Sequence, residues 1–424
     1  MADVRPLRGI HFNPDLVHLG GVLAPPYDVI SETQREELYG RDLRNIIRID
    51  FGRQLSGDEP GVNDRYTRAA EHLEAWLAIG VLVRDPGPSF YVTEHRFPAP
   101  DGTDRIRRGL IARVRATAWE NSDLRPHEHT LRGPKEDRLA LMRATATQTS
   151  PVFAVWRGAT GLEELLARAA GGRALLGGRT GGELGSEKHL LWVAEDRADV
   201  RAIEEALRGA SLYVADGHHR YETAAAYAAE RAAVGDGPDA DSQFALVSLS
   251  AADDPTTSLL PTHRLLLPRM GAAFSLDDLW MRLDDSWEVA PADDLTAASI
   301  AAGAQREECN AFAVRAHDGA AVLSRPRTPG GSPREALDVV VLQEEVLGPA
   351  GADEAAIREG ALGYTRSLDD VDRAVAAGEA VLGFVVNPAT TTEMIAVADA
   401  GEVMPQKSTY FYPKVPTGLV LSPL

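Results

Sequence analysis

The residues best suited to chemistry are concentrated in one run, Ser211–Tyr227, with the sequence SLYVADGHHRYETAAAY. Its apolar, β-prone residues 212–215 predict a short buried strand. Asp216 and Gly217 follow as a turn, and an alanine-rich segment of high helix propensity begins at about Tyr221. The run therefore predicts a strand, a turn and a helix, with the polar residues at the start of the helix.

Three basic residues, His218, His219 and Arg220, fall in the first turn of that helix. The N-terminal end of a helix carries partial positive charge, so cationic side chains are disfavoured there. An anion held by backbone N–H groups and by these side chains removes the conflict, and Gly217 lets the backbone approach it closely. The pattern predicts a phosphate-binding turn. The simpler alternative is an exposed turn whose basic side chains face water.

A second polar group is RPHEHT, in which His127, Glu128 and His129 lie on a loop between two prolines. A carboxylate beside imidazoles can act as general base for a hydroxyl nucleophile. The His-x-His spacing can instead supply two metal ligands, and a salt-bridged surface loop is the plain structural alternative. Lys135 begins the next helix near its positive end, where an anion would again explain its position.

Shorter polar segments occur elsewhere along the chain. Asp28 follows a double proline in APPYDVIS, and it either lines the site through Mg²⁺ or a substrate amine or accepts backbone hydrogen bonds in the turn. Thr262 and His263, in PTHR, either join the site or satisfy a hydrogen bond in the core. Lys407 and Ser408 belong to the tail phrase MPQKSTYFYPK, which we expect to fold back over the site, the alternative being a tail that only docks on the core.

The turn DGHHRY followed by a helix resembles the phosphate-binding motif of the ParB/sulfiredoxin superfamily, and among its members especially the free serine kinases. The chain as a whole resembles a bacterial and archaeal family known as a domain of unknown function, through the phrases APPYDVIS, RPHEHT, ADGHHRYETA, PTHR and MPQKSTYFYPK. The resemblance implies an α/β fold with mixed sheets, in which a ParB/sulfiredoxin-like phosphate-binding core is elaborated by further α/β regions.

The same resemblance implies a kinase acting on a small hydroxyl metabolite such as serine, with ATP or ADP as phosphate donor. Residues 217–220 would hold the nucleotide phosphates, Asp216 would position Mg²⁺ or the hydroxyl, and Glu128 would be the base. Two other functions stay open: a phosphatase of a small phosphomonoester such as phosphoserine, with His218 or His219 as nucleophile or acid, and a nucleotide sensor without turnover. Sulfiredoxin chemistry is disfavoured because His218 stands where those enzymes carry a cysteine.

Composition limits the partners of the protein. The net charge of −19 over 424 residues argues against general nucleic-acid binding, which needs a basic face. The single cysteine, Cys309, excludes an internal disulfide framework. No 18-residue apolar run and no signal peptide are found, so we expect a cytoplasmic protein without a membrane span. A small-molecule substrate and a nucleotide are the expected partners, and an oligomer is compatible with the sequence.

The predicted organisation has four parts: an N-terminal α/β region over 1–150, the phosphate-binding core over 151–268, a C-terminal α/β region over 269–400 and the tail over 401–424. Within it we expect a strand over RNIIRIDFG and a β-hairpin over residues 89–118. The glycine-rich segment GGRALLGGRTGGELG lacks nucleotide-loop spacing and predicts a flexible loop or a hairpin. DSQFALVSLS predicts a strand beside the Tyr213 strand.

Overall fold

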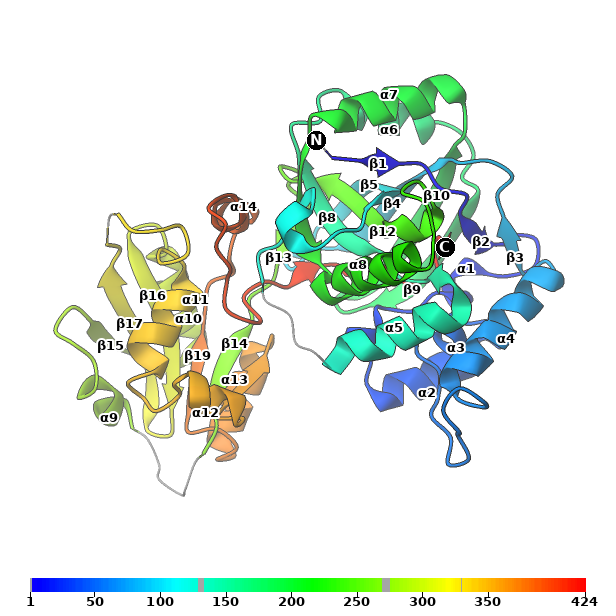
Figure 1. Ribbon diagram of the computed structural model, residues 1–424. Coiled ribbons are helices and arrows are strands. Elements are labelled where there is room, and N and C mark those ends of the chain that lie inside the picture. The colour runs from blue at the N-terminus through cyan, green and yellow to red at the C-terminus, as the bar shows by residue number, and fades with distance from the viewer. Residues whose placement is uncertain (1, 129–132, 269–274, 329) are drawn as a thin grey trace. The chain divides into compact units, whose positions relative to one another are not determined.

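The computed structural model describes residues 2–128, 133–268, 275–328 and 330–424. These residues form two compact units (Figure 1). Unit 1 comprises residues 1–126, 130–257 and 413–424, and unit 2 comprises residues 127–129 and 258–412.

Unit 1 is built on a mixed sheet with the strand order β6-β11-β8-β12-β5-β4-β10-β9, and β1 pairs with β5. The pairs β11–β6 and β12–β8 are parallel, and the other pairs of this sheet are antiparallel. The strands of unit 1 include four short ones, β2, β3, β7 and β21, that pair outside this sheet. The strands are β1 (Val4–Arg5), β2 (Ile10–Phe12), β3 (Leu82–Arg84), β4 (Phe90–Pro98), β5 (Asp104–Arg115), β6 (Leu124–Arg125), β7 (Thr147–Gln148), β8 (Val152–Arg157), β9 (Leu176–Gly182), β10 (Gly185–Ala194), β11 (Ser211–Asp216), β12 (Phe244–Ala251) and β21 (Ser422–Pro423).

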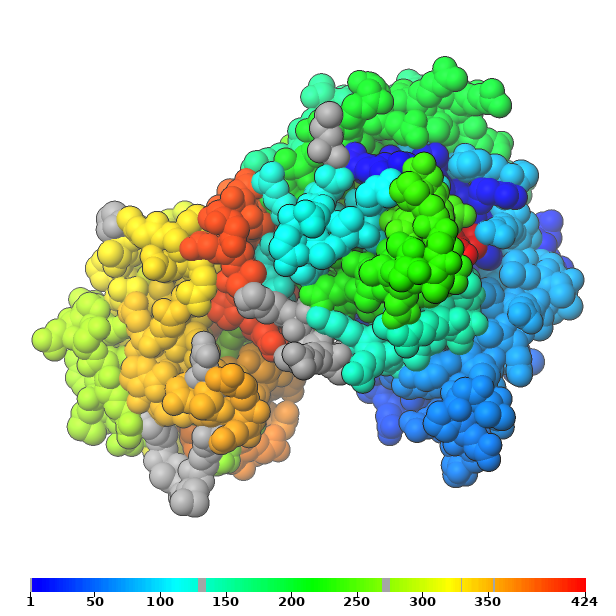
Figure 2. All heavy atoms as spheres, in the orientation of Figure 1, coloured from blue at the N-terminus to red at the C-terminus, as the bar shows by residue number. Residues whose placement is uncertain are grey.

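Helices cover both faces of this sheet because its strands alternate between two apolar sides. On β4, Phe90 and Val92 join the core under α6, α7 and α8, whereas Tyr91 joins the core under α1, α3 and α4. Helix α5 packs against both α4 and α8 (Figure 1 and Figure 2). The helices of unit 1 are α1 (Leu19–Val22), α2 (Glu32–Arg41), α3 (Ile47–Asp50), α4 (Arg65–Ala78), α5 (Gly133–Thr145), α6 (Leu162–Ala169), α7 (Arg197–Arg208) and α8 (His218–Ala233), with 3₁₀ turns at Tyr27–Val29, Trp119–Asn121 and Asp241–Gln243.

Unit 2 contains a six-stranded antiparallel sheet, β15-β17-β16-β19-β14-β18, and a two-stranded pair, β13–β20. Helices α10 and α13 cover one face of the larger sheet, and α9 and α11 contribute to the core on the other. The elements are β13 (Ser258–Leu259), β14 (His263–Leu266), α9 (Leu276–Trp280), β15 (Glu288–Ala292), α10 (Leu295–Ala304), β16 (Cys309–Ala316), β17 (Gly319–Pro326), α11 (Asp338–Val341), a π-helical segment (Leu342–Leu347), α12 (Glu354–Arg358), β18 (Leu362–Thr365), α13 (Leu368–Ala376), β19 (Leu382–Val385), α14 (Thr391–Asp399) and β20 (Phe411–Tyr412).

The mixed α/β class predicted from the sequence is therefore correct. Residues 1–150 and 151–268, which the sequence suggests as separate regions, contribute strands to the same sheet, because β5 of the first pairs with β12 of the second. The hairpin expected over 89–118 is present as β4–β5, and of the two possibilities for the glycine-rich segment, a flexible loop or a hairpin, the structure has the hairpin β9–β10. None of the described helices is long and apolar enough to span a membrane.

Two local expectations are wrong. RNIIRIDFG contains helix α3 instead of a strand, because the Asn45 side chain accepts a hydrogen bond from Ile47 N (3.0 Å) and starts a helical turn. Strand β12 lies beside β8 and β5, so β8 separates it from the Tyr213 strand. The end of the chain, residues 413–424, packs on unit 1: β21 pairs with β7, and Leu421 exchanges backbone hydrogen bonds with Ile10.

Candidate functional site

Strand β11 leads through one glycine into helix α8, as the sequence predicts. Gly217 has a φ of +93°, in the left-handed region that favours glycine. A Cβ atom at this position would also lie 2.8 Å from Arg220 Nε, so the turn has no room for a side chain. Among the described residues no side chain caps α8, and no acidic residue lies in its first turn. The positive end of this 16-residue helix is therefore not neutralised by a carboxylate in its own first turn or by a side-chain cap.

Arg220 supports this turn from within the protein. Its side chain is 7% exposed and donates to Ser150 Oγ (3.1 Å), to the Pro151 carbonyl oxygen and to Asp216 Oδ2 (2.8 Å). These bonds tie the start of α8 to the start of β8. The guanidinium therefore has a structural role in fixing the turn, which the sequence motif alone does not reveal.

Both carboxylate oxygens of Asp216 are paired with cations. Lys414 Nζ lies 3.1 Å from Oδ1, and Arg220 binds Oδ2. Burial raises the pKa of Asp216, but the charges of Lys414 and Arg220 outweigh it and hold the pKa well below its usual range. The side chain is therefore an anion at neutral pH, and it is a poor proton acceptor and a poor Mg²⁺ ligand in this arrangement.

The PYDV segment lies at the same place in unit 1. Asp28 is exposed, and its charge interacts with the buried Arg220 guanidinium. The neighbouring Tyr27 ring lies 4.2 Å from the guanidinium carbon of Arg138. Burial, with the Asp28 charge, raises the pKa of Tyr27 to about 12, so its hydroxyl stays protonated. Asp28 is thus an exposed carboxylate whose charge acts on the turn.

A buried polar layer extends from this point into the core. Arg138 donates to the Asp50 carbonyl oxygen (2.7 Å), and Thr149 Oγ1 donates to Asp50 Oδ1 (2.5 Å). Asp50 Oδ2 has no hydrogen-bond partner among the described residues. A hollow of about 30 Å³ lies beside it, lined among others by Asp50, Arg138, Ser150 and Arg220. It has room for about two water molecules, so a phosphate group would have to bind outside it.

The outer side of the turn carries the remaining predicted residues of unit 1. His218 is buried, and its ring centre lies 6.2 Å from that of Trp119, whereas His219 is half-buried. Lys135 of α5 forms an ion pair with Glu222 of α8, and Trp119 Nε1 donates to the same carboxylate (2.7 Å). Two histidines and one lysine are therefore placed around the first turns of α8.

The other predicted residues belong to unit 2. His127 is buried and hydrogen-bonded through Nε2 to Thr409 Oγ1 (2.9 Å), and its carbonyl oxygen accepts from Met404 N (2.7 Å). Glu128 forms a β-bridge with Met404. His129 lies outside the described residues. RPHEHT and the MPQKST phrase thus meet each other within unit 2.

PTHR joins them through backbone contacts. Arg264 donates to the Thr262 carbonyl oxygen and to the Lys407 carbonyl oxygen (3.2 Å), and Ser408 Oγ donates to the Pro405 carbonyl oxygen (2.5 Å). His263 is buried, and its Nδ1 accepts from Val386 N (3.4 Å). Burial lowers the pKa of Arg264 to about 10 and that of His263 to about 4, so the histidine is neutral. Arg264 is recognisable in the sequence as part of the polar triplet of PTHR within an apolar stretch, but its contacts with the two carbonyl oxygens are not.

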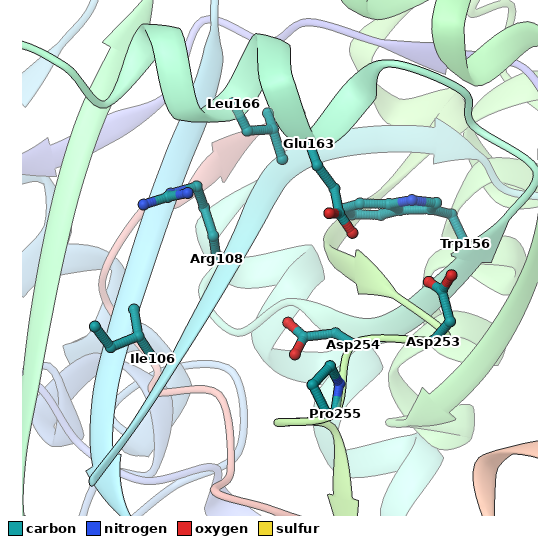
Figure 3. A pocket seen from close by; sticks show the side chains of 8 residues that line it. All are labelled: Ile106, Arg108, Trp156, Glu163, Leu166, Asp253, Asp254 and Pro255. Atoms are coloured by element: carbon teal, nitrogen blue, oxygen red, sulfur yellow. The ribbon is translucent and has the colours of Figure 1, made fainter.

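A wider pocket of unit 1 involves none of the predicted residues. It measures about 450 Å³ and lies between β5, the end of β8, α6 and the loop after β12 (Figure 3). Burial raises the pKa of Glu163 at this pocket, and the Asp253 and Asp254 carboxylates add to the effect. The residues that line it are Ile106, Arg108, Trp156, Glu163, Leu166, Asp253, Asp254 and Pro255.

The sequence does not point to Asp50, and it does not reveal the buried partners of Lys414 and Arg138. Asp50 follows three buried isoleucines in a segment that resembles a strand, so its polar contacts are hidden in the pattern. Lys414 lies 198 residues after its partner Asp216 in the sequence. A local motif cannot indicate such a pair.

Residues 4–340 match a sequence family described as "Protein of unknown function (DUF1015)". The chain belongs to this family. The match extends from β1 of unit 1 to α11 of unit 2 and includes the PYDV, RPHEHT, DGHHRY and PTHR phrases. No curated protein sequence matches this DUF1015 chain.

Several solved structures resemble the DUF1015 chain distantly. A conserved hypothetical protein from Pyrococcus furiosus has 17% identity and a TM-score of 0.34, over 70% of this chain and 90% of its own. A free serine kinase in complex with AMP has 16% identity and a TM-score of 0.33, over 70% and 89%. SbnI with C-terminal truncation from Staphylococcus aureus has 12% identity and a TM-score of 0.33, over 70% and 82%. At these TM-scores the likeness carries no functional argument.

Proposed function

We propose that this protein binds the phosphate groups of a nucleotide at the start of α8 and transfers a phosphoryl group to the hydroxyl of a small metabolite. The observation that supports this most directly is the first turn of α8, which begins at a left-handed glycine, has basic residues and has no acidic residue or side-chain cap among the described residues. Such a helix start binds anions through its N–H groups and its dipole. The choice of serine as the metabolite rests on the resemblance of the DGHHR turn to that of the free serine kinases.

In this proposal the backbone makes the main phosphate contacts. The N–H groups of the first turn face the phosphate, and His219 is accessible beside them. His218 and Lys135 lie near the same turn, where Lys135 is paired with Glu222. Arg220 and Lys414 act one layer below, where they hold the Asp216 anion and fix the turn. Catalysis of this kind consists mainly of positioning and charge stabilisation.

Asp28 is the carboxylate that we assign to the acceptor hydroxyl. It is exposed and interacts with the charge of Arg220, whereas Asp216 has both oxygens occupied. A carboxylate within hydrogen-bond reach of a hydroxyl can orient it and accept its proton. Glu128 belongs to unit 2, so its predicted role as base is a separate proposal that the same assay can test.

Mg²⁺ fits this site only in part. Asp216 is unsuited because two cations already pair with it, but Asp28 offers one exposed carboxylate, and Mg²⁺ is commonly held by one or two carboxylates together with substrate phosphates. When bound there, the ion would neutralise charge on the phosphate groups of ATP or ADP.

The test combines binding and turnover with the full chain. Thermal shift and calorimetric titration with ATP, ADP and CTP, with Mg²⁺ and with EDTA, identify the nucleotide; a ligand at 100 times its Kd adds about 2.7 kcal/mol of stability. Serine is then added, and phosphoserine is measured by mass spectrometry. We expect Asp28→Asn to keep nucleotide binding and to lower kcat by about 100-fold or more, and His219→Ala to weaken nucleotide binding.

The control is His317→Ala, which alters an exposed histidine of unit 2 and should change neither value. Absence of nucleotide binding by the natural chain would contradict the proposed site. Release of inorganic phosphate from phosphoserine without nucleotide would contradict phosphoryl transfer and indicate a phosphatase.

A further inference from the structure

Three buried polar side chains gather on two neighbouring strands of unit 1, apart from the residues discussed so far. His95 lies on β4, and Glu187 and His189 lie on β10. The antiparallel register places His95 opposite His189, and Glu187 is two residues before His189, so strand alternation brings all three side chains to one face. Their exposed fractions are only 7%, 7% and 3%.

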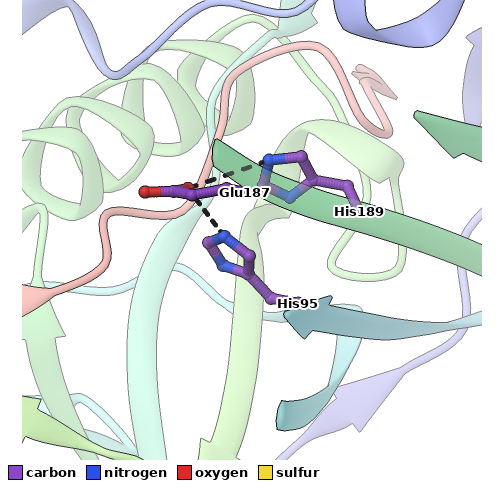
Figure 4. A group of neighbouring side chains, drawn as sticks. All are labelled: His95, Glu187 and His189. Carbon is purple, nitrogen blue, oxygen red and sulfur yellow. Dashed lines mark hydrogen bonds and ion pairs between the residues drawn. The ribbon is translucent and has the colours of Figure 1, made fainter. Parts of the chain in front are cut away.

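The carboxylate of Glu187 faces both imidazoles (Figure 4), whose ring centres lie 4.2 Å apart. Its Oε2 is 2.7 Å from His95 Nε2 and 3.9 Å from His189 Nε2, and one ligand atom from each residue lies within 4.8 Å of the others. Atoms bound to one tetrahedral ion at about 2.1 Å are roughly 3.4 Å apart, so small side-chain rotations bring these three atoms to coordinating positions. Two imidazole nitrogens and one carboxylate oxygen are a common donor set for zinc and similar ions.

We propose that His95, Glu187 and His189 form a mononuclear site for a divalent transition metal of the zinc type. The site goes beyond the proposed phosphate chemistry, because none of its three residues takes part in the turn. Thr180 on β9 has its Oγ1 2.8 Å from His189 Nε2, so when this nitrogen binds the ion the contact between them gives way and Oγ1 can add a neutral oxygen donor. A cavity of about 20 Å³, lined among others by His95 and His189, has room for about one water molecule as a further ligand.

The surroundings of the cluster keep both imidazoles in their neutral form. Burial lowers the pKa of His95 and brings that of His189 to about 3, and each value is lowered further by neighbouring groups, including the Arg107 guanidinium. Imidazoles bind metals in this unprotonated form. Burial also raises the pKa of Glu187, which reflects the cost of a buried carboxylate that a cation would offset.

The Arg107 guanidinium opposes a cation here. It donates to the Pro413 carbonyl oxygen (2.8 Å) and lies 4.8 Å from the centre of the Phe153 ring. The carbonyl oxygen and the aromatic ring are both electron-rich, so they offset part of the guanidinium charge. The negative charge of Glu187 offsets the rest of the Arg107 charge. Removal of this negative charge should therefore strongly lower the affinity for the metal.

The experiment measures metal content and affinity of the full chain. After chelator treatment and dialysis against Zn²⁺, elemental analysis should find about one ion per chain. Replacement by Co²⁺ should give the visible absorption of a four- or five-coordinate ion. We expect Glu187→Gln to weaken Zn²⁺ binding by about 100-fold or more, since loss of an outer partner alone costs about 10–100-fold. The control is His11→Gln, which breaks another buried histidine–carboxylate pair, His11 with Asp85 (3.3 Å), and should leave the metal in place.

A metal-free hydrogen-bonded triad is the alternative. If the natural chain retains no Zn²⁺ or Co²⁺ after dialysis, the site does not exist, and this result needs no variant to fold. If Glu187→Gln and a second variant, His189→Gln, retain the same metal content as the natural chain, the ion is bound elsewhere and the assignment is overturned. Neither result affects nucleotide binding, so the two proposals fail independently.

Discussion

Removal of Lys414 should destabilise unit 1, because this lysine is one of two cations that hold a buried aspartate. The Lys414 side chain is 12% exposed and the Asp216 side chain 19%. Breaking a buried ion pair from one side costs about 3–5 kcal/mol, since the other charge stays buried without its partner. Arg220 still binds Asp216 Oδ2 in the variant Lys414→Met, so we expect the lower end, about 3 kcal/mol. Asp216→Asn leaves both cations unpaired and should reach the upper end, about 5 kcal/mol.

The measurement is urea unfolding at pH 7, followed by tryptophan fluorescence. Four of the six tryptophans, Trp76, Trp119, Trp156 and Trp192, belong to unit 1 and report its unfolding. The double variant completes a cycle: because each substitution removes the same pair, its cost should be about 2 kcal/mol less than the sum of the single costs.

The matched control is Arg231→Met. Arg231 pairs with Asp236 at 2.9 Å but is 44% exposed, so its loss should cost at most about 1 kcal/mol. A cost below 1 kcal/mol for Lys414→Met, together with an additive cycle, would refute the conclusion that this pair fixes the turn before α8.

Three further predictions concern single positions. Gly217→Ala should lower the free energy of unfolding by about 1–3 kcal/mol, because a positive φ and the nearby Arg220 side chain leave no place for Cβ; an unchanged Tm would contradict this. His127→Ala should cost about 1–3 kcal/mol through the lost bond to Thr409, with Thr409→Ala as the partner measurement. Burial lowers the pKa of His263 to about 4, so only the unfolded chain binds a proton between pH 6.5 and 4. The free energy of unfolding should therefore fall as the pH falls through this range, and it should fall less in His263→Asn. If the urea midpoint changes equally between pH 7.5 and 5 in the natural chain and in the variant, this prediction is excluded.

The turn and its flanking elements could be predicted because their signals are local. An apolar run, a glycine and an alanine-rich segment fix the order strand, turn and helix within about twenty residues. The role of Arg220 could not be predicted in the same way. The motif suggests a phosphate ligand, yet the partners that bury this side chain, Ser150 and Pro151, come from the start of a strand 70 residues earlier. Packing between distant segments decides whether the Arg220 side chain points into the protein or toward a ligand.

The same limit explains the misread segment before α4. Ile46, Ile47 and Ile49 are β-branched and favour a strand by propensity, but all three are buried against the helical layer of unit 1. Asn45 stabilises the helical turn by bonding to the carbonyl oxygens of Gly21 and Leu23. Tertiary contacts thus override local propensity, and they place Asp50 beside the turn before α8.

The course of the chain also bears on the choice of base. The main segment of unit 2 runs from residue 258 to residue 412, and the residues at its two ends pair directly, Ser258 with Tyr412. Adjacent ends are what the insertion of one compact unit into another requires. Asp28, Asp216 and the turn before α8 therefore form within unit 1, whereas Glu128 forms with unit 2. Since Asp28→Asn and Glu128→Gln alter carboxylates of different units, the one that lowers kcat while nucleotide affinity stays unchanged identifies the unit that orients the hydroxyl. A loss with Glu128→Gln alone would show that unit 1 binds the phosphate without supplying the base.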